Sequence, residues 1–123
     1  MFIEQDRQSA ETIKVNLGKT KLTGRVRQQD VFDFLRQSST PETFQIIFAD
    51  PPYQTKKHGE RYTEKLLTNK ALLQLLEFSG VFVLEKRPGE AIPEMKFWRV
   101  IRQKTYGATE VLFLSRANQH ARI

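Results

Sequence analysis

Residues 44–53 read FQIIFADPPY, and this stretch decides the fold class more firmly than any other part of the chain. Positions 44–49 form an almost continuous apolar run of strand length, which is typical of a strand buried on both faces of a parallel sheet. The run stops at Asp50-Pro51-Pro52, because proline has a fixed φ and no backbone donor and so cannot continue a strand ladder. We therefore expect Asp50 to lie at the carboxyl end of a buried strand, in a stiff loop.

Strand and helix patterns alternate on both sides of this stretch, with Asp6 suited to cap the first helix. The expected strands are 1–4, 25–28, 44–49 and 81–85, the last opened by Gly80; the expected helices are 7–20, 31–36, 62–69 and 70–78; two further strands, 97–105 and 111–116, form a hairpin around a turn at 106–110. Alternation followed by a hairpin predicts one α/β domain over 1–123, a three-layer α/β/α arrangement with a C-terminal antiparallel hairpin.

Bulk composition restricts the classes of function. Hydrophobic residues make up 39% of the 123 residues and charged residues 28%, as in a folded soluble domain. The chain has no cysteine, which excludes disulfides, thiolate zinc sites and cysteine nucleophiles, and its two histidines are not spaced as ligands, so we expect no metal site. A net charge of +6 favours a polyanionic partner. No apolar run approaches membrane-spanning length and no signal peptide is evident, so a cytoplasmic location is expected.

The tetrapeptide Asp50-Pro51-Pro52-Tyr53 suits the methylation of an exocyclic amine. The Asp50 carboxylate and the Pro51 carbonyl are able to accept the two amine hydrogens, which aims the nitrogen lone pair at a sulfonium methyl group. Tyr53 is able to stack on a flat base, and the two prolines keep the acceptors fixed. No strong base is needed before attack, because the amine loses its proton after the methyl group has moved.

Acidic residues follow three of the expected strands. Open α/β sheets bind ligands at the carboxyl ends of their strands, where Glu4, Asp30 and Asp50 fall. Glu4 is suited to accept the ribose hydroxyls of a nucleoside cofactor, and Asp30 to receive an adenine amino group. For Glu4 or Asp30 alone, an exposed charge or a helix cap is the simpler explanation. Their common register favours a cofactor site.

The whole chain resembles the RsmD-type family of bacterial 16S ribosomal RNA guanine-N2 methyltransferases. The similarity runs through FIEQD, the helix containing Asn16-Leu17, QQDVFDFL, FADPPY, GVFVLEK and KTYGATEVLFLSR, in that order. The resemblance implies a Rossmann-like methyltransferase fold and S-adenosylmethionine as cofactor. It also implies 16S ribosomal RNA, or the assembling small ribosomal subunit, as partner.

The resemblance also assigns roles to individual residues. Glu4 matches the ribose-binding acid and Asp30 the adenine-side acid. The amine-methylation motif matches Asp50, Pro51, Pro52 and Tyr53, and Asp50 also borders the cofactor. Three basic residues just after the motif are expected near RNA phosphates, with a solvated loop as the alternative: Lys56, Lys57 and Arg61. The target guanine would be turned out of its stack to reach the motif.

One departure from the family concerns the beginning of the chain. Family members start with a hairpin and a first strand that ends in a glycine-rich cofactor loop, whereas this chain starts at what would be the second strand. We therefore expect a partial domain that lacks a central strand, and three outcomes are open: a fragment or a misassigned start, direct pairing of the two exposed strand edges, or a strand from another chain.

Two further functions remain open on sequence grounds. Motifs of this kind also serve methyltransferases that act on DNA adenine or cytosine or on protein glutamine, although the KTYG segment favours RNA guanine. A basic RNA-binding remnant without catalysis is the alternative from a different class. The leading interpretation is an rRNA guanine-N2 methyltransferase domain, with an active and an inactive truncated form both left open.

Overall fold

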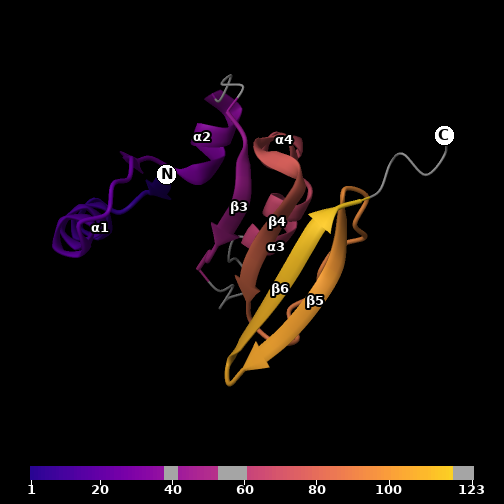
Figure 1. Cartoon of the computed structure of the whole chain (residues 1–123). Coiled ribbons are helices and arrows are strands. Elements are labelled where there is room, and N and C mark those ends of the chain that lie inside the picture. Colours follow the sequence, from indigo (N-terminus) through magenta and orange to yellow (C-terminus); the bar gives the residue numbers. More distant parts are fainter. Residues whose placement is uncertain (38–41, 53–60, 118–123) are drawn as a thin grey trace. The chain divides into compact units, whose positions relative to one another are not determined.

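A computed structural model describes residues 1–37, 42–52 and 61–117, and there the helices and strands follow the predicted α/β order (Figure 1). The chain divides into two compact units, Met1–Thr40 and Pro41–Ile123. The single domain over 1–123 stays a prediction.

The first unit is built on a two-stranded parallel sheet, in which Phe2 pairs with Val26 and Glu4 with Gln28. Its elements in chain order are β1 (Phe2–Glu4), α1 (Arg7–Thr20), β2 (Val26–Gln28) and α2 (Val31–Gln37). As predicted, Asp6 caps α1, because its carboxylate accepts the backbone N–H of Ser9 at 2.8 Å.

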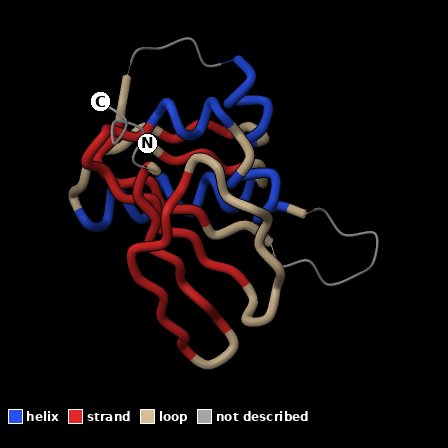
Figure 2. Tube along the Cα trace, turned by 90° about the vertical axis from the view of Figure 1, so that its right-hand side faces the viewer, coloured by secondary structure: helices blue, strands red, loops and turns tan. Residues whose placement is uncertain are grey.

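The second unit is built on a four-stranded mixed sheet with the order β3-β4-β6-β5, whose strands run side by side in Figure 2. Its elements in chain order are β3 (Phe44–Ala49), α3 (Tyr62–Leu67), α4 (Lys70–Leu75), β4 (Leu76–Lys86), β5 (Trp98–Tyr106) and β6 (Thr109–Arg116). β3 is parallel to β4, and β6 is antiparallel to both of its neighbours. The predicted C-terminal hairpin is therefore confirmed. Among the described helices, none is long and apolar enough to cross a membrane.

The core of the second unit lies between one face of this sheet and the two short helices. Alternate residues of β4 and β6 are fully buried, and Trp98 from β5 packs on Phe82 with ring centroids 4.9 Å apart. The helices contribute the buried leucines Leu66, Leu67, Leu72 and Leu75, and the buried Leu76 begins β4. Burial of this apolar surface is the main stabilising contribution.

A buried ion pair crosses the same face of the sheet. Lys86 on β4 and Glu110 on β6 are register partners, and their side chains form an ion pair with exposures of only 4% and 12%. The Lys86 ammonium also donates to the backbone carbonyls of Arg87, at 3.2 Å, and Glu90, at 2.8 Å. Gln103 donates to the Glu110 carboxylate. The lysine thus connects the sheet to the loop that follows β4.

The boundary between α4 and β4 differs from the prediction. The helix expected over 70–78 ends at Leu75, and β4 begins at Leu76, ahead of the expected start. A run of leucines does not distinguish a helix from a strand, and Gly80 lies within the strand instead of opening it. A Cβ atom at Gly80 would lie 2.8 Å from the Gln45 carbonyl oxygen, so the glycine permits the close approach of β3 at a register irregularity.

The hairpin turn is shorter than the predicted 106–110. Tyr106 pairs with Thr109, which leaves a two-residue turn in which Gly107 has a φ of +58°. Such turns match the twist of the flanking strands and need positive φ, which glycine adopts without strain.

The prediction that β3 is buried on both faces is wrong for the described structure. β3 pairs only with β4 and is an edge strand of its sheet, and Ile46 and Phe48 are 70% and 63% exposed. β1 and β3 belong to different sheets, and the three outcomes considered for the open sheet edges stay predictions.

Candidate active site

The acids predicted to hold a cofactor lie at one edge of the sheet in the first unit. Glu4 ends β1, and its register partner Gln28 ends the neighbouring parallel strand β2. The Gln29 N–H donates to the Glu4 carbonyl at 3.1 Å, and Asp30 follows directly. The structure therefore brings the ends that carry Glu4 and Asp30 to the same sheet edge, as expected for neighbouring parallel strands.

Each of these carboxylates also has a local structural role. One oxygen of Asp30, Oδ1, accepts the N–H groups of Phe32 at 2.8 Å and Asp33 at 3.0 Å, so Asp30 caps α2. Glu4 Oε2 accepts the N–H of Asp6 at 2.9 Å. In the described part of the chain, these bonds engage one oxygen of each side chain, so the second oxygen of each carboxylate remains for a hydroxyl or amino group.

The predicted amine site begins at the end of β3 in the second unit. Ala49 is the last strand residue and pairs with Leu84 of β4, and the chain leaves the sheet at Asp50. Asp50 is exposed, Pro51 is half-buried and Pro52 is exposed. The placement of an exposed carboxylate at the carboxyl end of a parallel strand, before a rigid proline pair, agrees with the prediction.

A second carboxyl group, which the sequence interpretation did not include, lies beside Asp50. Glu85 follows Leu84 on β4, so it occupies the position next to Asp50 on the neighbouring strand. Burial raises the pKa of Glu85 above its ordinary value, and the hydrogen bond and negative charge of the adjacent Asp50 side chain raise it further. The signal for Glu85 was present, since GVFVLEK is a second apolar run that ends in an acid.

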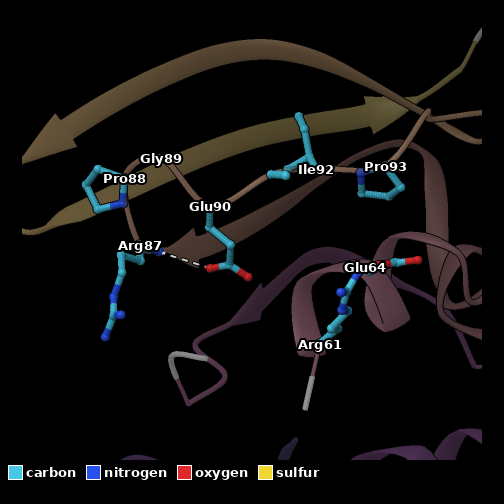
Figure 3. Close-up of a pocket in the computed structure, with 9 residues that line it drawn as sticks. Arg61, Glu64, Arg87, Pro88, Gly89, Glu90, Ile92 and Pro93 are labelled. Atoms are coloured by element: carbon cyan, nitrogen blue, oxygen red, sulfur yellow. Dashed lines mark hydrogen bonds and ion pairs between the residues drawn. The ribbon is translucent and has the colours of Figure 1, made fainter. Parts of the chain in front are cut away.

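A hollow of about 540 Å³ lies between the beginning of α3 and the loop that follows β4 (Figure 3). Arg61 and Glu64 form its α3 side, where Arg61 Nη1 lies 3.5 Å from Glu64 Oε1. On the loop side, the Arg87 N–H donates to the Glu90 carboxylate. Two arginines are thus balanced by two acids, so the hollow is not a concentrated positive site for phosphate.

The remaining predicted site residues fall elsewhere. Tyr53, Lys56 and Lys57 lie outside the described residues. Glu4 and Asp30 belong to the first unit, whereas Asp50 to Pro52 and Arg61 belong to the second. Glu4 and Asp30 thus lie at the carboxyl edge of the parallel strands of the first unit, and Asp50 lies at the carboxyl edge of the parallel strands of the second.

Parallel strands with acids at their carboxyl ends, followed by an antiparallel hairpin, define an α/β protein of the Rossmann-like methyltransferase fold. The family model described as Conserved hypothetical protein 95 matches residues 1–115. The chain belongs to this family, which is the RsmD-like family that the resemblance predicted.

Solved structures share the fold at low sequence identity. A conserved hypothetical protein from Streptococcus pyogenes is 22% identical with a TM-score of 0.74, and the match covers 96% of this chain and 71% of that protein. Human methyltransferase-like protein 13 in complex with SAH is 14% identical with a TM-score of 0.55, covering 96% and 61%. The rRNA methyltransferase aviRa from Streptomyces viridochromogenes is 21% identical with a TM-score of 0.52, covering 89% and 45%. No curated protein sequence matches the chain.

Proposed function

We propose that this chain is the amine-orienting part of an S-adenosylmethionine-dependent methyltransferase that modifies the N2 amine of a guanine in 16S ribosomal RNA. The observation that carries the proposal is the exposed Asp50 carboxylate, which stands before Pro51-Pro52 at the carboxyl end of a parallel strand. Family membership and the methyltransferase fold support the class of reaction. The cytoplasm stays the predicted location.

The acceptor amine would be oriented by two fixed oxygen atoms. In this proposal, the Asp50 carboxylate accepts one amine hydrogen and the Pro51 carbonyl accepts the other, so the nitrogen lone pair points away from both. Tyr53 is proposed to stack on the guanine ring. The contribution of these residues is positioning and preorganised polarity, which avoids reorganisation during the reaction.

The sheet edge in the first unit fits a nucleoside cofactor. Glu4 is half-buried at the end of β1, and its second carboxylate oxygen suits a ribose hydroxyl. Asp30 would direct its second oxygen to an adenine amino group while its first oxygen caps α2. When bound, S-adenosylmethionine supplies an electrophilic methyl group on a sulfonium sulfur.

RNA is favoured as acceptor by two observations. The net charge of +6 suits a polyanion. One structure with the same fold is an rRNA methyltransferase. Lys56, Lys57 and Arg61 are proposed to contact phosphates next to the target, and assembling small subunits are the proposed partner.

Calorimetric titration of S-adenosylhomocysteine into the full chain tests the cofactor site first. Glu4→Ala should weaken binding by at least about tenfold, because a charge-assisted hydrogen bond contributes about 1.5–3 kcal/mol. Glu11→Ala is the matched control, since Glu11 is an exposed acid on α1 that pairs only with Lys14 among the described residues. Equal affinities of the Glu4 variant and the wild type would refute the assigned cofactor site.

Transfer of a labelled methyl group to 16S ribosomal RNA tests the reaction, with DNA and a glutamine peptide as competing acceptors. Asp50→Ala should lower the rate by about 10²-fold or more, as loss of an orienting acceptor does in comparable sites. Transfer to DNA or peptide in preference to RNA would replace the proposed substrate. RNA binding without S-adenosylhomocysteine binding or methyl transfer would identify a non-catalytic RNA-binding protein.

A further inference from the structure

Two carboxyl groups of the second unit meet at the ends of adjacent parallel strands. Ala49 of β3 pairs with Leu84 of β4, so one residue further on Asp50 and Glu85 are neighbours. The Asp50 side chain is among the causes that raise the pKa of Glu85.

The residues around Glu85 on the neighbouring strands distinguish it from the other charged groups of the sheet. Successive strand residues point to opposite faces, so Glu85 lies on the face opposite the fully buried Leu84. Asp50 lies next to Glu85 at the end of β3, and the apolar, buried Val111 of β6 is the register partner of Glu85. β5 places the exposed Lys104 beyond Val111.

The next charged residue after Lys86 is Arg87, which lies in the loop beyond β4 and has an exposed side chain. Lys86 itself points to the opposite face and is paired with Glu110. The hydrogen bond and negative charge of Asp50 therefore add to burial in raising the pKa of Glu85, and no neighbouring cation is among the causes of that shift. A carboxylate with a raised pKa is a better proton acceptor than an ordinary one.

We propose that Glu85 takes up, through Asp50, the proton that the methylated amine loses. This inference rests on the proposed function. The new N–C bond forms from the nitrogen lone pair, and the carbon–sulfur bond breaks with its electron pair retained by sulfur. The nitrogen is then cationic, and its proton passes to the Asp50 carboxylate and on to Glu85. The protonated Glu85 donates a hydrogen bond back to Asp50, which restores the orienting carboxylate.

Carboxyl-carbon NMR titration of the full chain, without ligand, tests the coupling of the two acids directly. The Glu85 midpoint should lie above that of an ordinary glutamate and fall toward it in Asp50→Asn, since the neighbouring negative charge is removed. Glu77→Gln, which changes an acid at the other end of β4, should leave the Glu85 midpoint in place. A Glu85 midpoint that is the same in wild type and Asp50→Asn overturns the proposal, whatever the activity of the protein.

The pH profile of methyl transfer to 16S ribosomal RNA tests the role in the reaction. Wild-type transfer should slow as pH falls through the Glu85 midpoint, because the acceptor is then already protonated. Glu85→Gln keeps the size of the side chain and the ability to donate a hydrogen bond, but it accepts no proton. This variant should be slower by about tenfold or more and should lack that acidic limb.

The two arms separate the inference from the function on which it rests. A Glu85→Gln profile with the same shape as the wild-type profile overturns the proton-acceptor role while the methyltransferase function stands. Coupled midpoints with no methyl transfer by the wild type overturn the proposed function, and the proton-acceptor role falls with it. Circular dichroism spectra of Glu85→Gln and wild type should superimpose, so that a rate difference reports on chemistry.

Discussion

Removal of the Lys86 ammonium is expected to destabilise the second unit strongly. Lys86→Met leaves the Glu110 carboxylate, 12% exposed, without its counter-ion, and it also frees the carbonyls of Arg87 and Glu90. Breaking a buried pair by removal of one partner costs about 3–5 kcal/mol, because the remaining charge has no compensation. A loss of this size is a large fraction of the stability of an ordinary domain.

Urea unfolding monitored by tryptophan fluorescence measures this loss. Trp98, the single tryptophan of the chain, is 3% exposed against Phe82 and therefore reports on the same core. The midpoint should fall by about 2 M urea for an m-value of about 2 kcal/mol per M. Lys104→Met is the matched control, since Lys104 is exposed on β5 and its removal should change stability by less than about 0.5 kcal/mol.

A double variant decides whether the ion pair is the cause. Lys86→Met combined with Glu110→Met replaces both charges with apolar side chains and should recover most of the loss, because no uncompensated charge remains. Stability of Lys86→Met within about 1 kcal/mol of the wild type would refute the reasoning. Equal stability of the single and double variants would refute the assignment of the loss to Glu110.

Three further outcomes are expected. Gly80→Ala should cost about 1–3 kcal/mol in urea unfolding, because the new Cβ atom would lie 2.8 Å from a β3 carbonyl oxygen; Gly18→Ala, with open space around it, should not destabilise. Asn69→Ala should cost about 1 kcal/mol, since the Asn69 side chain caps α4 through the Leu72 N–H; no loss would show that the cap contributes nothing. The hydrogen bond with Lys86 lowers the pKa of the Glu110 carboxyl group. The ionised Glu110 therefore stabilises the fold at pH values above its unfolded-state pKa, and this stabilisation is lost as pH falls through its folded-state pKa. Glu110→Gln should flatten the resulting fall of stability with acid in urea titrations at successive pH values.

Local signals in the sequence predicted most elements correctly. The 7–20 helix and the 44–49 strand have their predicted bounds, because a capping aspartate and a proline pair mark where these elements begin or end. The end of α4 was not predicted, since the leucines near 75 suit a helix and a buried strand equally. The exposure of Ile46 was not predicted either, because burial depends on which strands and helices cover a face.

The candidate site was predicted in part for the same physical reason. Asp50 is recognised by its prolines, and Glu4 and Asp30 by their positions after apolar strands. Glu85 was missed because its importance arises from the pairing of β3 with β4, which brings together residues far apart in the chain. A sequence pattern predicts that a strand ends in an acid, whereas the register of the sheet decides which acid is its neighbour.

Two consecutive residues of β4, Glu85 and Lys86, carry opposite charges toward opposite faces of the sheet. A slip of β4 by one residue that puts Glu85 in the place of Lys86 would bring Glu85 into the core opposite Glu110, where two carboxylates would meet without the Lys86 counter-ion. The order of the two charges therefore disfavours this alignment, which the apolar residues alone would permit. An insertion or deletion within this strand should be tolerated less well than one in the loop that follows it.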